Sequence, residues 1–172
     1  MGDGGVAHVE RVLPAESDTQ ALGSSLASLG ATPRGVVRLH GDLGAGKTTL
    51  VRAWLRGLGH AGAVRSPTYT LVEPYDIEVG GGRLAFMHFD LYRMADEEEL
   101  DAIGFRDYLA GDALCVIEWP ERAPGLLADA DLDIHLVPEG DGRRIRLVAR
   151  SARATKWLNA AFPGQVTVDT LR

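Results

Sequence analysis

Residues 39–50 read LHGDLGAGKTTL, a short apolar segment that runs into a glycine-rich loop. Residues 41–48 fit the pattern G-x-x-x-x-G-K-[ST], with an apolar strand pattern at 36–39 and a helical pattern after the loop. In such a loop backbone N–H groups point at phosphate oxygens, and the helix that follows adds the positive end of its dipole. The stretch therefore predicts a phosphate-binding loop between a strand and a helix.

Two side chains of this loop carry specific roles. Lys47 is expected to reach the β- and γ-phosphates of a nucleotide, and the Thr48 hydroxyl is expected to take a Mg²⁺ position. The chain has only two lysines, which argues against a chance lysine at this position. The residues expected to contact the nucleotide are Gly41, Asp42, Leu43, Gly44, Ala45, Gly46, Lys47, Thr48 and Thr49, together with Thr68 and Trp119 discussed below.

Length and composition limit the rest. At 172 residues the chain is expected to form a single domain over residues 1–172, built around the phosphate loop. No apolar run is long enough to span a bilayer and no signal peptide is recognisable, so we expect a cytoplasmic protein without membrane contact. The net charge of −6 argues against a chain that binds nucleic acid through its overall electrostatic potential. Any role with nucleic acid is expected to run through a partner.

Hydrophobic periodicity outlines the other elements. A first helix is predicted over 18–29, with a capping box at 17–20 and a stop at Gly30. The remaining predictions are a hairpin from 70–77 and 83–89, a helical stretch after Asp96 that breaks near Gly104, a strand at 113–117, a second hairpin from 132–137 and 143–149 with its turn at 141–142, and a helix at 151–162 capped by Ser151. These elements predict the α/β class: a three-layer P-loop NTPase-like fold whose mixed, mainly parallel central sheet has antiparallel hairpins at its edges.

Two acidic residues follow apolar strands. Asp90 ends one predicted strand and Glu118 ends another, and the 22 residues between them allow a right-handed crossover that makes the strands parallel. Both carboxylates should then lie at the edge where the glycine loop lies. Glu118 is the better candidate for holding Mg²⁺ and Asp90 for aligning or deprotonating the attacking water, although the opposite division of roles stays open.

Other polar residues allow two interpretations. The hydroxyl-rich residues 66–70, which include Thr68, either sense a γ-phosphate or form a solvated turn, and Trp119 is either a core residue or an aromatic wall of the site. His40 and His88 are interpreted as packed neutral histidines. The arginine cluster Arg143, Arg144, Arg146, Arg150 and Arg153 is interpreted as protection of a sheet edge, or as a surface for an acidic partner or RNA.

Four motifs together resemble the TsaE/YjeE family. They are GDLGAGKTT at 41–49, SPTYTLVEPY at 66–75, HFDLYR at 88–93 and IEWPER at 117–122, and the resemblance covers about residues 10–150 in the same order and spacing. The family comprises the ATPase of bacterial tRNA threonylcarbamoyladenosine (t6A) formation. The resemblance implies ATP and Mg²⁺ as cofactors, TsaB and TsaD as partner proteins that handle most of the tRNA contact, and functional roles for Thr48, Asp90, Glu118 and Trp119.

Three classes of activity remain at this point. The first is a switch in which Lys47, Asp90 and Glu118 catalyse ATP hydrolysis, Thr48 and Glu118 hold the metal, and turnover resets the TsaB–TsaD complex. The second is a small-molecule kinase, which would need a mobile arginine-bearing lid; the insert near 78–83 holds only Arg83. The third is a nucleotide-binding scaffold without hydrolysis. A guanine-reading N-K-x-D motif is absent from the sequence, which disfavours a GTPase.

Overall fold

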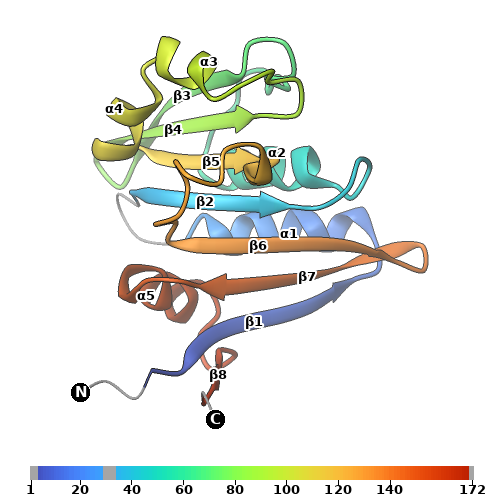
Figure 1. Ribbon diagram of the computed structural model, residues 1–172. Coiled ribbons are helices and arrows are strands. Elements are labelled where there is room, and N and C mark those ends of the chain that lie inside the picture. Colours follow the sequence, from blue (N-terminus) through green and yellow to red (C-terminus); the bar gives the residue numbers. More distant parts are fainter. Residues whose placement is uncertain (1–3, 29–33, 171–172) are drawn as a thin grey trace.

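The computed structural model describes residues 4–28 and 34–170 (Figure 1). Over these residues the chain forms one eight-stranded sheet in the order β3-β4-β5-β2-β6-β7-β1-β8. The strands are β1 (Val6–Leu13), β2 (Gly35–His40), β3 (Val72–Val79), β4 (Gly82–Asp90), β5 (Leu114–Glu118), β6 (Leu132–Glu139), β7 (Gly142–Ala149) and β8 (Thr167–Asp169). The helices are α1 (Glu16–Leu26), α2 (Lys47–Gly57), α3 (Glu98–Ala102), α4 (Phe105–Ala110), the short 3₁₀ helix η1 (Pro120–Arg122) and α5 (Ala152–Ala161).

The centre of the sheet is parallel. Strands β4, β5, β2 and β6 run in the same direction, so their carboxyl ends meet at one edge, on the right in Figure 1. The β3–β4 and β6–β7 hairpins add antiparallel strands, as predicted for a mixed sheet. The chain leaves β2 toward β4 on one side and leaves β5 toward β6 on the other. Open α/β sheets bind ligands at such a change of direction, which here lies between β2 and β5.

Two apolar cores cover the two faces of the sheet, because side chains alternate along each strand. Val37 and Leu39 of β2 belong to the core that also contains residues of α1, α2 and α5. Phe89 and Ile117, from β4 and β5, belong to a second core with residues of α3 and α4. Helices therefore pack on both faces, and the predicted three-layer α/β fold is confirmed.

The structure corrects three local predictions. β1 was not predicted, although Ala7, Val9 and Leu13 alternate with less buried residues on it; β8 was also not predicted. Helix α1 begins at Glu16, where Asp18 accepts a hydrogen bond of 2.8 Å from the Ala15 backbone N–H, so the capping box at 17–20 was placed too late. The predicted end of this helix, Leu29 with Gly30, lies outside the described residues.

The turn of the second hairpin also differs from the prediction. Glu139 pairs with Gly142, so the two turn residues are Gly140 and Asp141 and not Asp141 and Gly142. Gly140 has a φ of 57°, a left-handed conformation that glycine adopts without steric cost. In the described ranges, the structure contains no helix with the length and apolar character needed to cross a bilayer.

Candidate nucleotide-binding site

The glycine loop connects β2 to α2. Gly44 and Gly46 have φ values of 79° and 100°, in the left-handed region that residues with a side chain rarely adopt. Gly46 is also the N-cap of α2, and no side chain caps this helix. The N–H groups of the first helical turn are therefore left for a ligand, as the sequence pattern requires.

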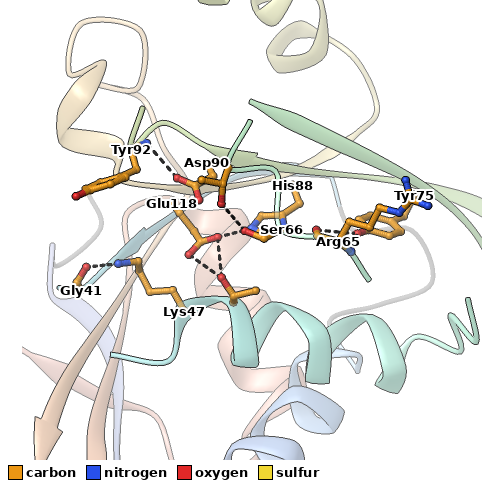
Figure 2. Close-up of polar contacts among 11 residues, drawn as sticks. Gly41, Lys47, Arg65, Ser66, Tyr75, His88, Asp90, Tyr92 and Glu118 are labelled. Atoms are coloured by element: carbon orange, nitrogen blue, oxygen red, sulfur yellow. Dashed lines mark hydrogen bonds and ion pairs between the residues drawn. The ribbon is translucent and has the colours of Figure 1, made fainter. Parts of the chain in front are cut away.

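Lys47 is 95% buried and bends back over its own loop (Figure 2). Its Nζ donates hydrogen bonds to the backbone oxygen of Gly41 and, at 3.2 Å, to that of Asp42. Nζ also lies 4.0 Å from the centre of the Trp119 ring. Burial lowers the pKa of Lys47, and the nearby carboxylates of Glu118 and Asp90 oppose this shift. A phosphate bound in the loop would replace weak carbonyl contacts with a full negative charge.

The two predicted carboxylates lie side by side. Asp90 and Glu118 are paired in the parallel register of β4 and β5, at the last residue of each strand. Thr48 Oγ1 lies 3.4 Å from both carboxylate oxygens of Glu118, which joins the glycine loop to the strand end. Figure 2 shows the Asp90 and Glu118 side chains close together above the first turn of α2. The sequence-predicted catalytic and metal-binding residues are thus neighbours in space.

The local environment of Asp90 shifts its protonation. Burial raises the pKa of Asp90, and the neighbouring Glu118 carboxylate adds to this rise. The Tyr92 backbone N–H donates a 3.0 Å hydrogen bond to Asp90 Oδ1, which acts in the opposite direction. A carboxylate with a raised pKa accepts a proton more readily.

The donor atoms at this edge fit a Mg²⁺ ion. The Thr48 hydroxyl and the carboxylates of Glu118 and Asp90 are hard oxygen donors, which Mg²⁺ prefers in proteins. With one or two protein ligands and free space on the side of the loop, the arrangement leaves positions for phosphate oxygens and water.

His88 belongs to this site, which the sequence did not reveal. It is fully buried, as expected for a packed histidine, but its Nε2 lies 2.6 Å from Glu118 Oε2. Its Nδ1 has no hydrogen-bond partner among the described residues. The available signal was its position two residues before Asp90, because alternate residues of a strand share a face.

His40 lies on the opposite face of the sheet from the loop helix. Its ring stacks on His135 at 4.4 Å, and its Nε2 lies 2.9 Å from Asp133 Oδ1. His40, Asp133 and His135 therefore meet, so His40 does not pack in isolation. The Asp133 oxygens also accept hydrogen bonds from Arg38 and Arg150, so this group is an ion-pair network with its carboxylate already occupied.

A cavity of about 410 Å³ lies over the loop. Most of the residues that line it were predicted: Asp42, Leu43, Gly44, Ala45, Gly46, Lys47, Thr48, Thr49, Thr68, Asp90, Glu118 and Trp119. Gly41 is not part of the lining and instead accepts the hydrogen bond from Lys47. Residues Ser66, Tyr92, Arg93 and Arg143 complete the wall. Tyr92 and Arg93 follow Asp90 closely in sequence, whereas Arg143 comes from the distant strand β7.

Strained backbone borders the cavity. Leu71, with φ of 64°, and Trp119, with φ of 58°, are the non-glycine residues with positive φ in the described part of the chain. Such conformations cost energy and cluster at functional sites. Leu71 ends the hydroxyl-rich segment, in which the Ser66 and Thr68 hydroxyls are hydrogen bonded at 2.8 Å. The segment therefore joins β3 through a strained residue and presents hydroxyls to the cavity.

The arginine cluster does not protect a sheet edge, because β7 lies between β6 and β1. That interpretation failed because β1 was not predicted. Four of the arginines pair with carboxylates: Arg144 with Glu10 and Glu139, Arg146 with Asp169, Arg150 with Asp133 and Arg153 with Asp131. Most of the positive charge of the cluster is thus neutralised locally.

Comparisons with known proteins agree on one family. Residues 13–145 match the family model described as threonylcarbamoyl adenosine biosynthesis protein TsaE. The chain is 52% identical over 116 residues to the tRNA threonylcarbamoyladenosine biosynthesis protein TsaE of Haemophilus influenzae, covering 67% of this chain and 71% of the relative. It is 37% identical over 127 residues to the protein of the same name from Bacillus subtilis, covering 74% and 76%.

The fold is also similar to a solved structure. The crystal structure of Bacillus subtilis YdiB aligns with a TM-score of 0.72 and 28% sequence identity, covering 91% of this chain and 95% of that chain.

Proposed function

This chain belongs to the TsaE family of threonylcarbamoyl adenosine biosynthesis proteins, and we propose that it is a Mg²⁺-dependent ATPase that serves threonylcarbamoylation of the adenosine next to certain tRNA anticodons. The observation that supports this proposal is the pairing of Asp90 with Glu118 beside Thr48 of the phosphate loop. We further propose that hydrolysis resets a complex with TsaB and TsaD, and that this takes place in the cytoplasm.

The loop binds the nucleotide in this proposal. The free N–H groups of the α2 first turn donate to the phosphate oxygens, and Lys47 exchanges its contacts with Gly41 and Asp42 for the β- and γ-phosphates. Thr48 and Glu118 would hold Mg²⁺, which supplies charge neutralisation on the phosphate oxygens. Trp119 packs on Lys47 and forms one wall of the site.

Asp90 aligns the attacking water and takes up its proton. Its raised pKa and its position next to Glu118 suit a general base at the γ-phosphate end of the cavity. Residues 66–70 report whether the γ-phosphate is present, because Ser66 and Thr68 line the same cavity and Leu71 stores strain at the end of the segment. The rate of hydrolysis then sets how long the partner complex stays in its ATP-bound state.

The test is a comparison of variants in ATP binding and hydrolysis. We expect Lys47→Ala to lose ATP binding. Asp90→Ala should keep most of the binding and lose about 10²–10³ in turnover, the usual effect of removing one positioned group. Both are measured by calorimetry and by free phosphate release, with and without TsaB and TsaD. Full turnover in Asp90→Ala would remove this residue from the mechanism.

The same measurement separates the other activity classes. A small-molecule kinase would release little free phosphate without its acceptor, and a scaffold would bind ATP without turnover in either condition. The structure disfavours the kinase, because the β3–β4 turn is tight and Arg83 pairs with Asp76 across the hairpin at 2.5 Å. Arg83 is therefore held in the sheet and does not belong to a lid.

A further inference from the structure

We propose that Arg143 is a phosphate ligand that holds the non-reacting end of the nucleotide's phosphate chain. This inference rests on the proposed function. Arg143 is the member of the arginine cluster for which the structure shows no ion pair within the described residues, and its Nη1 is buried without a hydrogen-bond partner there. A buried N–H group of a guanidinium without an acceptor is costly, so its position calls for a ligand.

Arg143 lies directly over the phosphate loop. A Cβ added to Gly46 would overlap the Arg143 guanidinium, with Nη1 the nearest atom. The glycine before Lys47 therefore has a second use besides its left-handed φ: it leaves room for this guanidinium. Arg143 also lines the cavity together with the loop residues. In Figure 1 the β6–β7 hairpin, which carries Arg143 at its β7 end, lies at the same edge as the loop after β2.

The charge arrangement favours an anion between Arg143 and α2. Gly46 is the N-cap of α2, so the guanidinium lies at the positive end of this helix dipole. A cation beside free N–H groups is repelled unless a negative group lies between them. Phosphate oxygens satisfy both sets of donors at once, because a guanidinium presents a fork of N–H groups that matches phosphate geometry.

The sheet order indicates which end of the phosphate chain Arg143 contacts. Asp90 and Glu118 lie on β4 and β5, on one side of β2, whereas Arg143 lies on β7, beyond β6 on the other side. The reacting γ-phosphate must lie near the two carboxylates. Arg143 therefore faces the α- and β-phosphates, which are the same in ATP and ADP.

This position predicts that Arg143 stabilises bound ATP and the transition state of hydrolysis by the same amount. Arg143→Gln should weaken ATP and ADP by the same factor, about 10–100-fold, the range for one hydrogen-bonded charge. Turnover at saturating ATP should stay within about threefold. Arg143→Lys keeps the charge without the fork and should show an intermediate loss.

The experiment is calorimetric titration of ATP, ADP and inorganic tripolyphosphate into wild type, Arg143→Gln and Arg144→Gln, with thermal unfolding as the check on folding. Arg144→Gln is the matched control, since it removes the same charge one residue away, where Arg144 pairs with Glu10 and Glu139. We expect the affinity for all three ligands to fall only in Arg143→Gln. Unchanged affinity, a fall in turnover alone, or weaker nucleotides with unchanged tripolyphosphate would each overturn the assignment. A wild type that binds no ATP would instead refute the proposed function.

Discussion

His88 shows how a residue can position a side chain of the candidate site without taking part in the proposed chemistry. Its Nε2 is 2.6 Å from Glu118 Oε2, and both side chains are almost completely buried. The contact fixes Oε2 of Glu118, while both carboxylate oxygens lie 3.4 Å from Thr48 Oγ1, beside the proposed metal position. Partners that orient metal ligands in this way typically change metal affinity by about 10–100-fold when they are removed.

We expect His88→Leu to weaken Mn²⁺ binding in the presence of ADP by about 10–100-fold, measured by electron paramagnetic resonance of the free ion. His88→Gln keeps an N–H donor of similar reach and should recover part of the loss. If both variants bind Mn²⁺ like the wild type and only unfold more easily, His88 is a packing residue, as its sequence context first indicated.

Residues near a motif were predictable, whereas residues brought in by the fold were not. Lys47, Thr48, Asp90 and Glu118 could be located from sequence, because a glycine loop and the ends of parallel strands must meet at one edge. Arg143 could not be located, because its contact with Gly46 depends on the length and register of the β6–β7 hairpin. His88 could not be assigned to the site from sequence, because a packed histidine and a histidine paired with a carboxylate give the same strand pattern.

At the scale of elements, Asp133 joins three strands. It is almost completely buried on β6 and accepts hydrogen bonds from Arg38 and His40 of β2 and from Arg150, which follows β7. Burial alone would raise the pKa of Asp133, but these hydrogen bonds outweigh it and hold the pKa far below its usual range. The network therefore stabilises the contact of β2 with β6 and with the end of β7, the strand that carries Arg143.

We expect Asp133→Asn to lower the free energy of unfolding by about 2–3 kcal/mol at neutral pH, measured by urea denaturation. This is below the usual cost of breaking a buried ion pair, because Arg38 and Arg150 are partly exposed. Asp76→Asn is the control: its pair with Arg83 is exposed, so its loss should be under about 1 kcal/mol.

The pH dependence of this difference has a defined sign. A carboxyl group whose pKa is lowered by folding adds stability above its unfolded pKa of about 3.9, and this stability is lost as the pH falls toward the folded pKa. The gap between wild type and Asp133→Asn should be constant between about pH 5 and 7 and should shrink below about pH 4. A gap that stays constant down to acid pH would show that Asn disrupts packing and not charge.

The elements themselves were mostly predictable, with failures that have physical causes. The β3–β4 and β6–β7 hairpins and the break between α3 and α4 follow from local periodicity and glycine positions. β1 was missed because three inward positions out of eight residues make a weak signal, and its pairing with β7 is far away in sequence. That single omission turned an internal strand into an apparent edge and led to the wrong interpretation of the arginines.

For the whole molecule, the relevant quantity is how charge is distributed. The net charge is −6, and Arg144, Arg146, Arg150 and Arg153 are matched by carboxylates within 4 Å. A surface of paired charges produces little positive potential to attract a polyanion. Association with nucleic acid depends on protein cations that release its counterions. This charge distribution supports the proposal that other chains bring the tRNA.

We expect the chain alone to bind tRNA more weakly than about 10⁻⁴ M at physiological salt, the weak end of non-specific binding, as measured by fluorescence anisotropy of labelled tRNA. Addition of TsaB and TsaD should bring chain and tRNA into one complex. Replacing Arg146 by Glu should leave the affinity of the isolated chain unchanged, because this arginine already faces Asp169 at 3.7 Å. Micromolar binding by the isolated chain, with a steep loss on added salt that the Arg146 variant reduces, would show that the cluster contacts tRNA directly. The paired carboxylates would then be exchanged for phosphates on binding, and the chain would handle its RNA without a partner.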